Sequence, residues 1–435
     1  MRLSPLLTQS LHTFGIRASN IVIAALLSIL VARALGPAGR GLYSLPAILA
    51  AFATSLYSGL STATSYYLLR EPKGRGALRA AFATGTAFVF LGVMSVVALA
   101  IATRQPWAAL PATLALPSSA IMMIVSGYCY GINRVPLGNF LNLCTTATIL
   151  ILAAAGFFLV DRTASVAIGA WIIGQAAVAI VALVLTLLHA RRLAVISMPT
   201  SLFASYATKV GFVNLVTLLN YRADVYIVAT LASIAALGLY TVAVAGAETL
   251  LIVTQVLAAV TLPRIGSMRP KEAAIFTARC VRLSLVVSLV FGFAALLLAE
   301  PAVRVLFGSA FLASVAPLRI LVVGVVALSV GGLFSNFFTL VLGRPQLPLL
   351  VAAISAVTCI GTSIALVPRV GIVGAAIATS LAYVVGQAIA LVLFCRRSGI
   401  PFRKALLPGI GDTASLQSLF VSTVEGGREA REPTT

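Results

Sequence analysis

Long apolar segments alternate with short polar connectors along almost the whole chain. A helix needs about 20 mainly apolar residues to cross the hydrocarbon core of a bilayer. Twelve segments meet this condition, at approximately 11–34, 42–69, 80–103, 107–131, 137–160, 164–189, 206–231, 236–263, 275–299, 312–342, 346–367 and 371–395. The pattern therefore predicts an all-α integral membrane protein with twelve transmembrane helices.

The basic residues of the connectors predict how these helices are oriented. If both termini and the loops after every second helix lie on one side, that side holds twenty Lys and Arg residues. The opposite loops hold only six, namely Arg33, Arg40, Arg104, Arg162, Arg304 and Arg369. Because cytoplasmic loops of membrane proteins carry the excess of Lys and Arg, we expect a multi-pass protein of the cell (inner) membrane with both termini in the cytoplasm.

A weak internal repeat relates the two halves of the chain. Residues 31–43 read VARALGPAGRGLY, residues 228–240 read VATLASIAALGLY, and six of the thirteen positions coincide at an offset of 197. A repeat of six helices returns the chain to its starting side, so the halves share their orientation. We therefore expect two six-helix bundles, residues 1–200 and 201–397, related by a pseudo-twofold axis along the membrane normal. The polar residues 398–435 are expected to form a disordered cytoplasmic tail.

The composition agrees with a chain whose surface faces lipid. It is 60% hydrophobic and 9% charged, whereas soluble domains are about 25% charged. The net charge of +20 could indicate nucleic-acid binding, but no basic domain exists apart from the apolar segments. The five cysteines have no C-x-x-C spacing, and hydrolase, P-loop and dinucleotide motifs are absent. We therefore expect no catalytic residues, no metal, no cofactor and no nucleic-acid partner.

Ionisable residues inside the predicted helices are the candidates for function. Six are singled out: Arg17, Lys209, Arg222, Asp224, Glu248 and Arg319. An ionised side chain at bilayer depth costs at least about 2.5–3.5 kcal/mol, so it persists where it faces a polar cavity or a partner. For Arg17, Lys209 and Arg319 the alternative is that the long side chain reaches the headgroups.

The segment 206–263 holds four of these residues and reads as a helical hairpin that turns near 233–237. Arg222 and Asp224 are two positions apart, so they cannot share a helix face and each needs its own partner. One interpretation is an Arg222–Glu248 ion pair that joins the two helices. The other, which we favour, is that these groups line a solvated path, since a purely structural ion pair gains little over apolar packing.

The residue types indicate which solutes such a path would accept. Arginine binds phosphate with two parallel hydrogen bonds, so the expected substrate-binding residues are Arg17, Lys209, Arg222 and Arg319. Glu248 and Asp224 are expected to couple transport to protons or sodium ions. Amide side chains could bind sugar hydroxyls, and they are Asn133, Asn139, Asn142, Asn214, Asn220, Asn336, Gln175, Gln255 and Gln387.

Several apolar motifs resemble those of a known family. They are ILVARALGPAGRGLYSL at 29–45, ADVYIVATLASIAALGLYTVAVAGAETLL at 223–251, Leu262-Pro263-Arg264, and GIVGAAIATSLAYVVGQ at 371–387. Over about 10–397 the chain resembles polysaccharide flippases of the Wzx type, in the superfamily that also holds MATE exporters and lipid II flippases.

The resemblance implies a function, a fold and site residues. Such flippases move an undecaprenyl-pyrophosphate-linked oligosaccharide from the cytoplasmic to the outer leaflet by alternating access, for O-antigen, capsule or exopolysaccharide synthesis. It implies two bundles around a central lumen, an acidic residue at Asp224 and a cavity arginine near Arg17. Membrane lipid and a polysaccharide polymerase are the candidate partners.

Two other functions remain as alternatives. A MATE-like, cation-coupled exporter of small molecules would need net acidic cavity walls, whereas the buried charges here are four basic and two acidic. A membrane glycosyltransferase, polymerase or ligase would need catalytic groups on a sizeable outer loop. The predicted outer connectors are short and offer only Asp161 and Glu300 as acidic residues, so we expect a transporter and not an enzyme.

Overall fold

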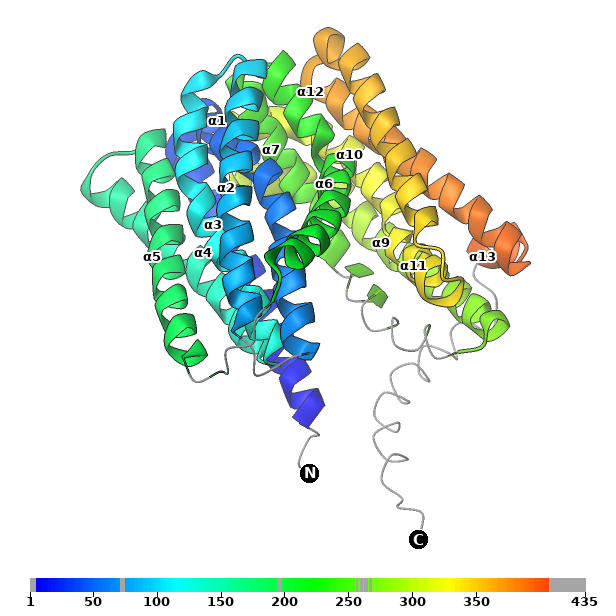
Figure 1. Ribbon diagram of the computed structural model, residues 1–435. Coiled ribbons are helices and arrows are strands. Elements are labelled where there is room, and N and C mark those ends of the chain that lie inside the picture. The colour runs from blue at the N-terminus through cyan, green and yellow to red at the C-terminus, as the bar shows by residue number, and fades with distance from the viewer. Residues whose placement is uncertain are drawn as a thin grey trace.

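The computed structural model of the protein is built of helices joined by short turns, with no strand among the described residues (Figure 1). It describes residues 5–70, 75–191, 193, 198–252, 254–255, 257–258, 261, 265 and 268–406. The first half contains α1 (Pro5–Arg70), α2 (Gly76–Ala102), α3 (Ala109–Gly131), α4 (Val135–Leu159) and α5 (Ala164–Ala190). The second half contains α6 (Thr200–Leu231), α7 (Ile234–Glu248), α9 (Pro270–Leu306), α10 (Val315–Leu328), α11 (Gly331–Asn336), α12 (Gln346–Ser398) and α13 (Phe402–Leu406). The predicted all-α class is confirmed.

Two of these helices each contain two of the predicted crossings. α1 is kinked at Gly36, where φ is 66°, and α12 is kinked at Gly371, where φ is 61°. Glycine adopts positive φ without steric cost, so it lets the chain reverse at these points. Within the described residues nine helices are long and apolar enough to cross a membrane, and two of them, of 56 and 53 residues, are long enough to cross it twice. With the shorter α7, this is consistent with the twelve predicted crossings.

The helices form two groups that meet at one end. α1–α5 pack on one another, α9–α12 do the same, and α6 and α7 contact α1. In Figure 1 the two groups approach each other at the top and, away from the seam between α1 and α6, diverge toward the opposite end, where α1 begins. We therefore propose that the chain divides near residue 200 into the two bundles that the repeat predicts.

Reciprocal glycine contacts hold the two halves together at the end far from the termini. A Cβ atom at Gly41 would overlap the backbone carbonyl of Ile234, and one at Gly238 would overlap the backbone carbonyl of Pro37. Pro37 and Ile234 are separated by the same 197 positions as Gly41 and Gly238. The G-L-Y motifs of the repeat therefore pack against each other, as in a two-fold symmetric interface.

Hydrogen bonds from Arg33 also connect the two halves at the same end. The guanidinium group of Arg33 donates hydrogen bonds to the carbonyl oxygens of Leu306, at 2.8 Å, and Val305. These carbonyls end α9 and have no partner within their own helix. A basic side chain is favourable at this position because it complements the negative end of the helix dipole.

The seam between residues 42–70 of α1 and α6 is closed from one end to the other. Two hydrogen bonds and a ring stack follow it: Tyr226 Oη to the carbonyl of Ile48 at 2.9 Å, Asn214 Nδ2 to Ser58 Oγ at 2.7 Å, and Tyr66 on Tyr206 with ring centroids 4.8 Å apart. Between them Gly59 and Gly211 allow the backbones to approach closely.

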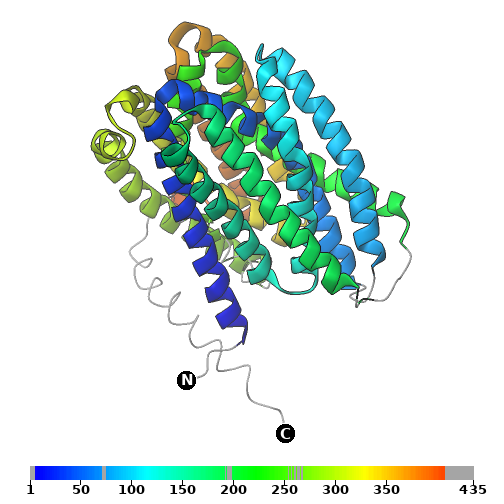
Figure 2. The same ribbon diagram turned by 90° about the vertical axis from the view of Figure 1, so that its left-hand side faces the viewer.

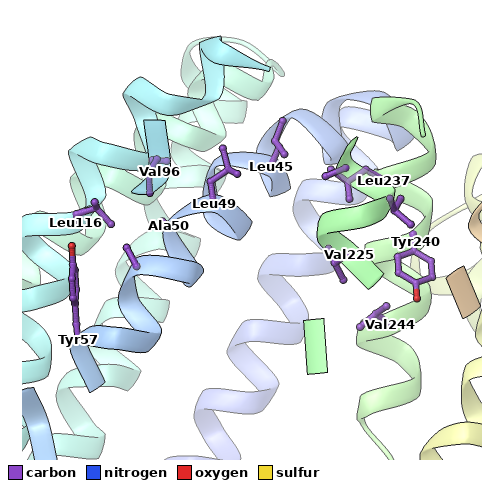
Figure 3. Packing of buried hydrophobic residues seen from close by; sticks show 14 of the residues in the cluster. Leu45, Leu49, Ala50, Tyr57, Val96, Leu116, Val225, Leu237, Tyr240 and Val244 are labelled. Atoms are coloured by element: carbon purple, nitrogen blue, oxygen red, sulfur yellow. The ribbon is translucent and has the colours of Figure 1, made fainter. Parts of the chain in front are cut away.

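Buried apolar side chains continue across both halves (Figure 3). Leu45 and Leu49 of α1 lie in the same cluster as Leu237 and Val244 of α7, and all four are fully or almost fully buried. The end at which the halves meet is therefore packed and apolar.

The ordered structure extends beyond the predicted start of the tail. Residues 402–406 form α13, which packs on α9, and Ala405 is fully buried there. Disorder was expected from residue 398 because the polar composition of 407–435 dominates the tail. Ala405 and Leu406 nevertheless pack with a buried apolar cluster that includes residues of α9. Residues from 407 onward lie outside the described residues.

We predict that Gly41→Ala and Gly238→Ala each lower the midpoint of thermal unfolding in detergent. The added methyl overlaps a backbone carbonyl that cannot rotate away, and such overpacking costs about 1–3 kcal/mol. Differential scanning fluorimetry measures the effect. Gly361→Ala is the matched control, because nothing lies within 4 Å of its Cβ position. A midpoint equal to that of wild type in both variants would contradict the close approach.

Candidate functional site

A central cavity of about 300 Å³ lies where the two halves meet. Residues 40–51 of α1, 218–226 of α6 and 241–248 of α7 line it. Its charged lining groups are Arg40, Arg222 and Glu248. The predicted hairpin thus supplies one wall and the first half supplies the other.

Arg222 and Glu248 form an ion pair on the wall of this cavity. Arg222 Nη2 donates to Glu248 Oε2 at 2.8 Å, and the two side chains remain 39% and 30% exposed. The turn between α6 and α7 sets this geometry, because Ser233 Oγ accepts a hydrogen bond from the backbone N–H of Ala236 and caps α7. The pair therefore joins the two helices and also faces the cavity. An ion pair between the helices and charged groups that line a solvated path are thus compatible interpretations.

Arg40 also lines the central cavity, although the sequence assigned it to a connector. Its side chain is only 9% exposed. Nη2 donates to Ser28 Oγ at 3.0 Å, the guanidinium lies 5.8 Å from the ring centroid of Tyr43, and Nε is buried with no partner. Arg40 lies between the predicted helices 11–34 and 42–69, but the helix resumes directly after Gly36 and carries Arg40 inward. The sequence offered one indication that Arg40 lies on a helix: Arg40 and Tyr43 are three positions apart, which places them on the same helix face.

Asp224 lies apart from the central cavity, inside the second half. Its Oδ1 accepts the backbone N–H of Val225 at 2.8 Å. Its Oδ2 accepts the hydroxyls of Thr379, at 2.7 Å, and Tyr240. The carboxylate is 2% exposed and joins α6, α7 and α12. Asp224 and Arg222 therefore have different partners, as their spacing predicts, and Asp224 and Glu248 occupy different sites.

α1 and α4 lie side by side (Figure 2), and Arg17 lies in a polar groove between them. The groove measures about 380 Å³, and its lining consists of Arg17, Asn20, Asn139, Asn142, Thr145 and Thr146. Arg17 Nε donates to Asn139 Oδ1 at 3.4 Å, while Asn20 Oδ1 is buried without a partner. A cation beside several amides and hydroxyls can bind a phosphate and the sugar attached to it.

A further cavity of about 330 Å³ lies within the second half. It is bounded by α6, α11, α12 and the π-helical turn η3 (Phe337–Val341). Its lining is mainly apolar, but Asn220 and Gln387 contribute side-chain oxygens that are buried without partners. Other amides named from the sequence make structural bonds instead. Gln175, for example, donates to Ser119 Oγ at 2.6 Å.

Lys209 and Arg319 line none of these three cavities. Both side chains are exposed, and Arg319 Nε donates to the carbonyl of Leu296 at 3.2 Å. Their positions agree with the alternative in which long basic side chains reach the headgroups. Of the four arginine and lysine candidates, the structure places Arg222 in the central cavity and Arg17 in the polar groove.

Comparison with known proteins gives one family match. Residues 140–316 match the family described as polysaccharide biosynthesis protein. Among curated proteins, no sequence matches the chain significantly.

Solved transporter structures share the fold of the whole chain. An inward-facing multidrug resistance MATE transporter of the MOP superfamily has a TM-score of 0.72 at 14% identity, with 87% of this chain and 94% of that chain covered. The lipid II flippase MurJ in an inward closed conformation also gives 0.72 at 14% identity, with 96% and 93% covered. An outward-facing MATE transporter gives 0.61 at 16% identity, with 89% and 96% covered.

These similarities confirm the resemblance found in the sequence. The helices are those of a multi-pass membrane protein. The chain has the fold of the MOP-superfamily transporters, and its residues 140–316 match the family of polysaccharide biosynthesis proteins.

Proposed function

We propose that the protein flips an undecaprenyl-pyrophosphate-linked oligosaccharide from the cytoplasmic to the outer leaflet of the cell membrane. The observation that carries this proposal is the charge of the central cavity, which holds the guanidinium groups of Arg40 and Arg222 against one carboxylate, Glu248. The family match and the fold support a membrane flippase or transporter. The identity of the substrate and the direction of transport are our proposal.

The chemistry of the substrate explains why such a cavity is needed. A diphosphate and a glycan cannot enter hydrocarbon without losing their hydration, whereas a polyprenyl tail can stay in it. The protein must therefore replace water around the headgroup only. Guanidinium groups replace it well at phosphate, since their planar fork donates two parallel hydrogen bonds.

The polar groove at Arg17 is proposed to receive the headgroup first. The groove and the central cavity both involve α1, and the groove lies in the part of α1 nearer the N-terminus. Its amides and hydroxyls suit sugar groups, and its arginine suits the phosphate. A diphosphate that passes from the groove to the central cavity would remain beside a cation throughout.

The shape of the molecule supports alternating access. Outside the α1–α6 seam, which is closed along its length, the halves are packed at the end far from the termini and diverge toward the other end. With both termini in the cytoplasm, as the Lys and Arg distribution predicts, this state would accept a headgroup from the cytoplasmic side. The TM-score is higher for the inward-facing than for the outward-facing MATE structure, in agreement with this assignment.

Coupling to a proton or sodium gradient is proposed to depend mainly on Asp224. Glu248 is already neutralised by Arg222, whereas no ion pair to Asp224 is found in the described part of the chain. A buried carboxylate that accepts only hydroxyl and amide hydrogens is suited to bind a cation or a proton.

A MATE-like exporter of small cations is the second candidate, because the MATE structures share this fold. The excess of guanidinium groups over carboxylates in the central cavity argues against cationic cargo. Transport of a cationic dye by vesicles containing the protein, without translocation of lipid-linked glycan, would favour this second function.

The first prediction separates the two roles of the Arg222–Glu248 pair. Arg222→Gln should abolish most translocation of a fluorescent lipid-linked oligosaccharide in proteoliposomes. If the pair only joined α6 to α7, the double variant Arg222→Gln/Glu248→Gln would restore activity, since no charge is then left unpaired. We expect the double variant to fold with wild-type stability and to stay inactive. Recovery of translocation would assign the pair a structural role.

A second prediction concerns the polar groove. Arg17→Gln should lower the translocation rate about tenfold or more, because one charge-assisted hydrogen bond to phosphate is worth about 1.5–3 kcal/mol. Arg162→Gln, on an exposed connector, makes the same change in charge and should leave the rate unchanged. Equal rates in the two variants would remove the groove from the pathway.

The third prediction concerns coupling. Translocation by Asp224→Asn should lose its acceleration by an imposed proton or sodium gradient, while the rate without a gradient changes less. Each gradient is imposed separately on proteoliposomes, so the ion is identified in the same experiment. The matched control is Glu248→Gln, which removes a carboxylate of the central cavity. Gradient acceleration that survives in Asp224→Asn and disappears in Glu248→Gln would move the coupling role to Glu248.

A further inference from the structure

We infer that Arg40 is a specificity-determining residue of the central cavity, and that it recognises the second phosphate of a polyprenyl diphosphate. This inference rests on the proposed function and assigns part of its substrate recognition to a residue that the sequence placed in a connector. The argument begins with the state of the Arg40 guanidinium group.

Arg40 is a buried cation with an unused hydrogen-bond donor. Nine-tenths of its surface is covered, Nη2 is held by the uncharged Ser28 Oγ, and Nε has no partner. No carboxylate pairs with it among the described residues. A buried donor without a partner costs free energy, and a buried charge without a counter-ion costs more. A ligand anion beside the guanidinium would supply the missing counter-charge.

The other arginine of the cavity is in a different state. Arg222 is neutralised by Glu248 at 2.8 Å. The net positive charge of the lining therefore resides on Arg40. At low local dielectric an unscreened cation attracts an anion more strongly than a cation that is already paired. An anion that enters this cavity should bind first to Arg40.

The geometry around Arg40 holds its side chain in place. Ser28 precedes the kink at Gly36 and Arg40 follows it, so the Nη2–Oγ bond crosses the kink. The ring of Tyr43, 5.8 Å away, packs against the guanidinium. Little side-chain entropy is then lost when the guanidinium binds a ligand.

The size of the cavity suits a diphosphate better than a whole oligosaccharide. Its volume of about 300 Å³ equals that of on the order of ten water molecules. A diphosphate fits within it, with one phosphate at Arg40 and the other near Arg222. A monophosphate would occupy only one of these positions, so the cavity should discriminate between the two headgroups.

Binding of short polyprenyl phosphates to the purified full-length protein tests this assignment. The probes are farnesyl diphosphate, farnesyl monophosphate, inorganic diphosphate and farnesol, and affinities are measured by isothermal titration calorimetry. We expect wild type to prefer farnesyl diphosphate to the monophosphate. Arg40→Met should weaken diphosphate binding about tenfold or more and bring the two affinities close together. Arg40→Lys keeps the charge but loses the planar fork, so its preference should fall by a smaller factor.

Thermal stability separates a binding role from a structural one. Arg40→Met removes a buried charge without a counter-ion, so its midpoint of thermal unfolding should equal or exceed that of wild type. Arg162→Met is the control for the lost charge and should change neither the midpoint nor the preference. An unchanged preference for diphosphate in both Arg40→Met and Arg40→Lys would overturn the inference. If Arg40→Met does not fold, the preference of Arg40→Lys for diphosphate over monophosphate decides, and an unchanged preference overturns the inference.

The same data distinguish this inference from the proposed function. Tighter binding of farnesyl diphosphate than of inorganic diphosphate supports a lipid headgroup as the ligand at Arg40. Equal binding of the two overturns the assignment to a polyprenyl lipid. If wild type binds farnesyl diphosphate no better than farnesol, the proposed function itself fails, and the role of Arg40 fails with it.

Discussion

The structure depends on how closely two backbones approach at the end of the molecule far from the termini. Gly41 and Gly238 allow this approach, because each lies against a carbonyl of the other half where a side chain cannot fit. The packed apolar cluster and the Arg33 bonds to the end of α9 follow from this approach. The central cavity lies beside this contact, since Arg40 and Tyr43, which line it, flank Gly41 in the chain.

Charge inside the molecule is compensated in a different way at each site. Arg33 binds carbonyl oxygens at a helix end, Arg222 binds a carboxylate, and Asp224 accepts hydroxyl and amide hydrogens. Arg40 alone among these four has a buried nitrogen without a partner. Charges that are paired within the protein can stabilise one conformation of a membrane protein. A buried charge without a counter-ion can instead bind a ligand of opposite charge.

The sequence predicted the helices well and the placement of the side chains less well. Hydropathy determines which segments can cross a bilayer, so the helices and the hairpin of α6 and α7 could be recognised from the positions of the apolar segments. The separate partners of Arg222 and Asp224 also followed from their spacing. The locations of Lys209 and Arg319 depend instead on which face of each helix packs inward, and nearly uniform apolar helices carry little information about that. Arg40 was missed because a kink at a single glycine looks like a loop in the sequence.

The glycine contact also limits how the protein can evolve. When two side chains collide, a smaller residue on the opposite helix can relieve the collision. At Gly41 and Gly238 the nearest opposing atom is a carbonyl oxygen of the peptide backbone, which no substitution at Ile234 or Pro37 can remove. Second-site suppressors of a change at either glycine should therefore arise elsewhere, in residues that favour the conformation in which the two halves are apart at this end.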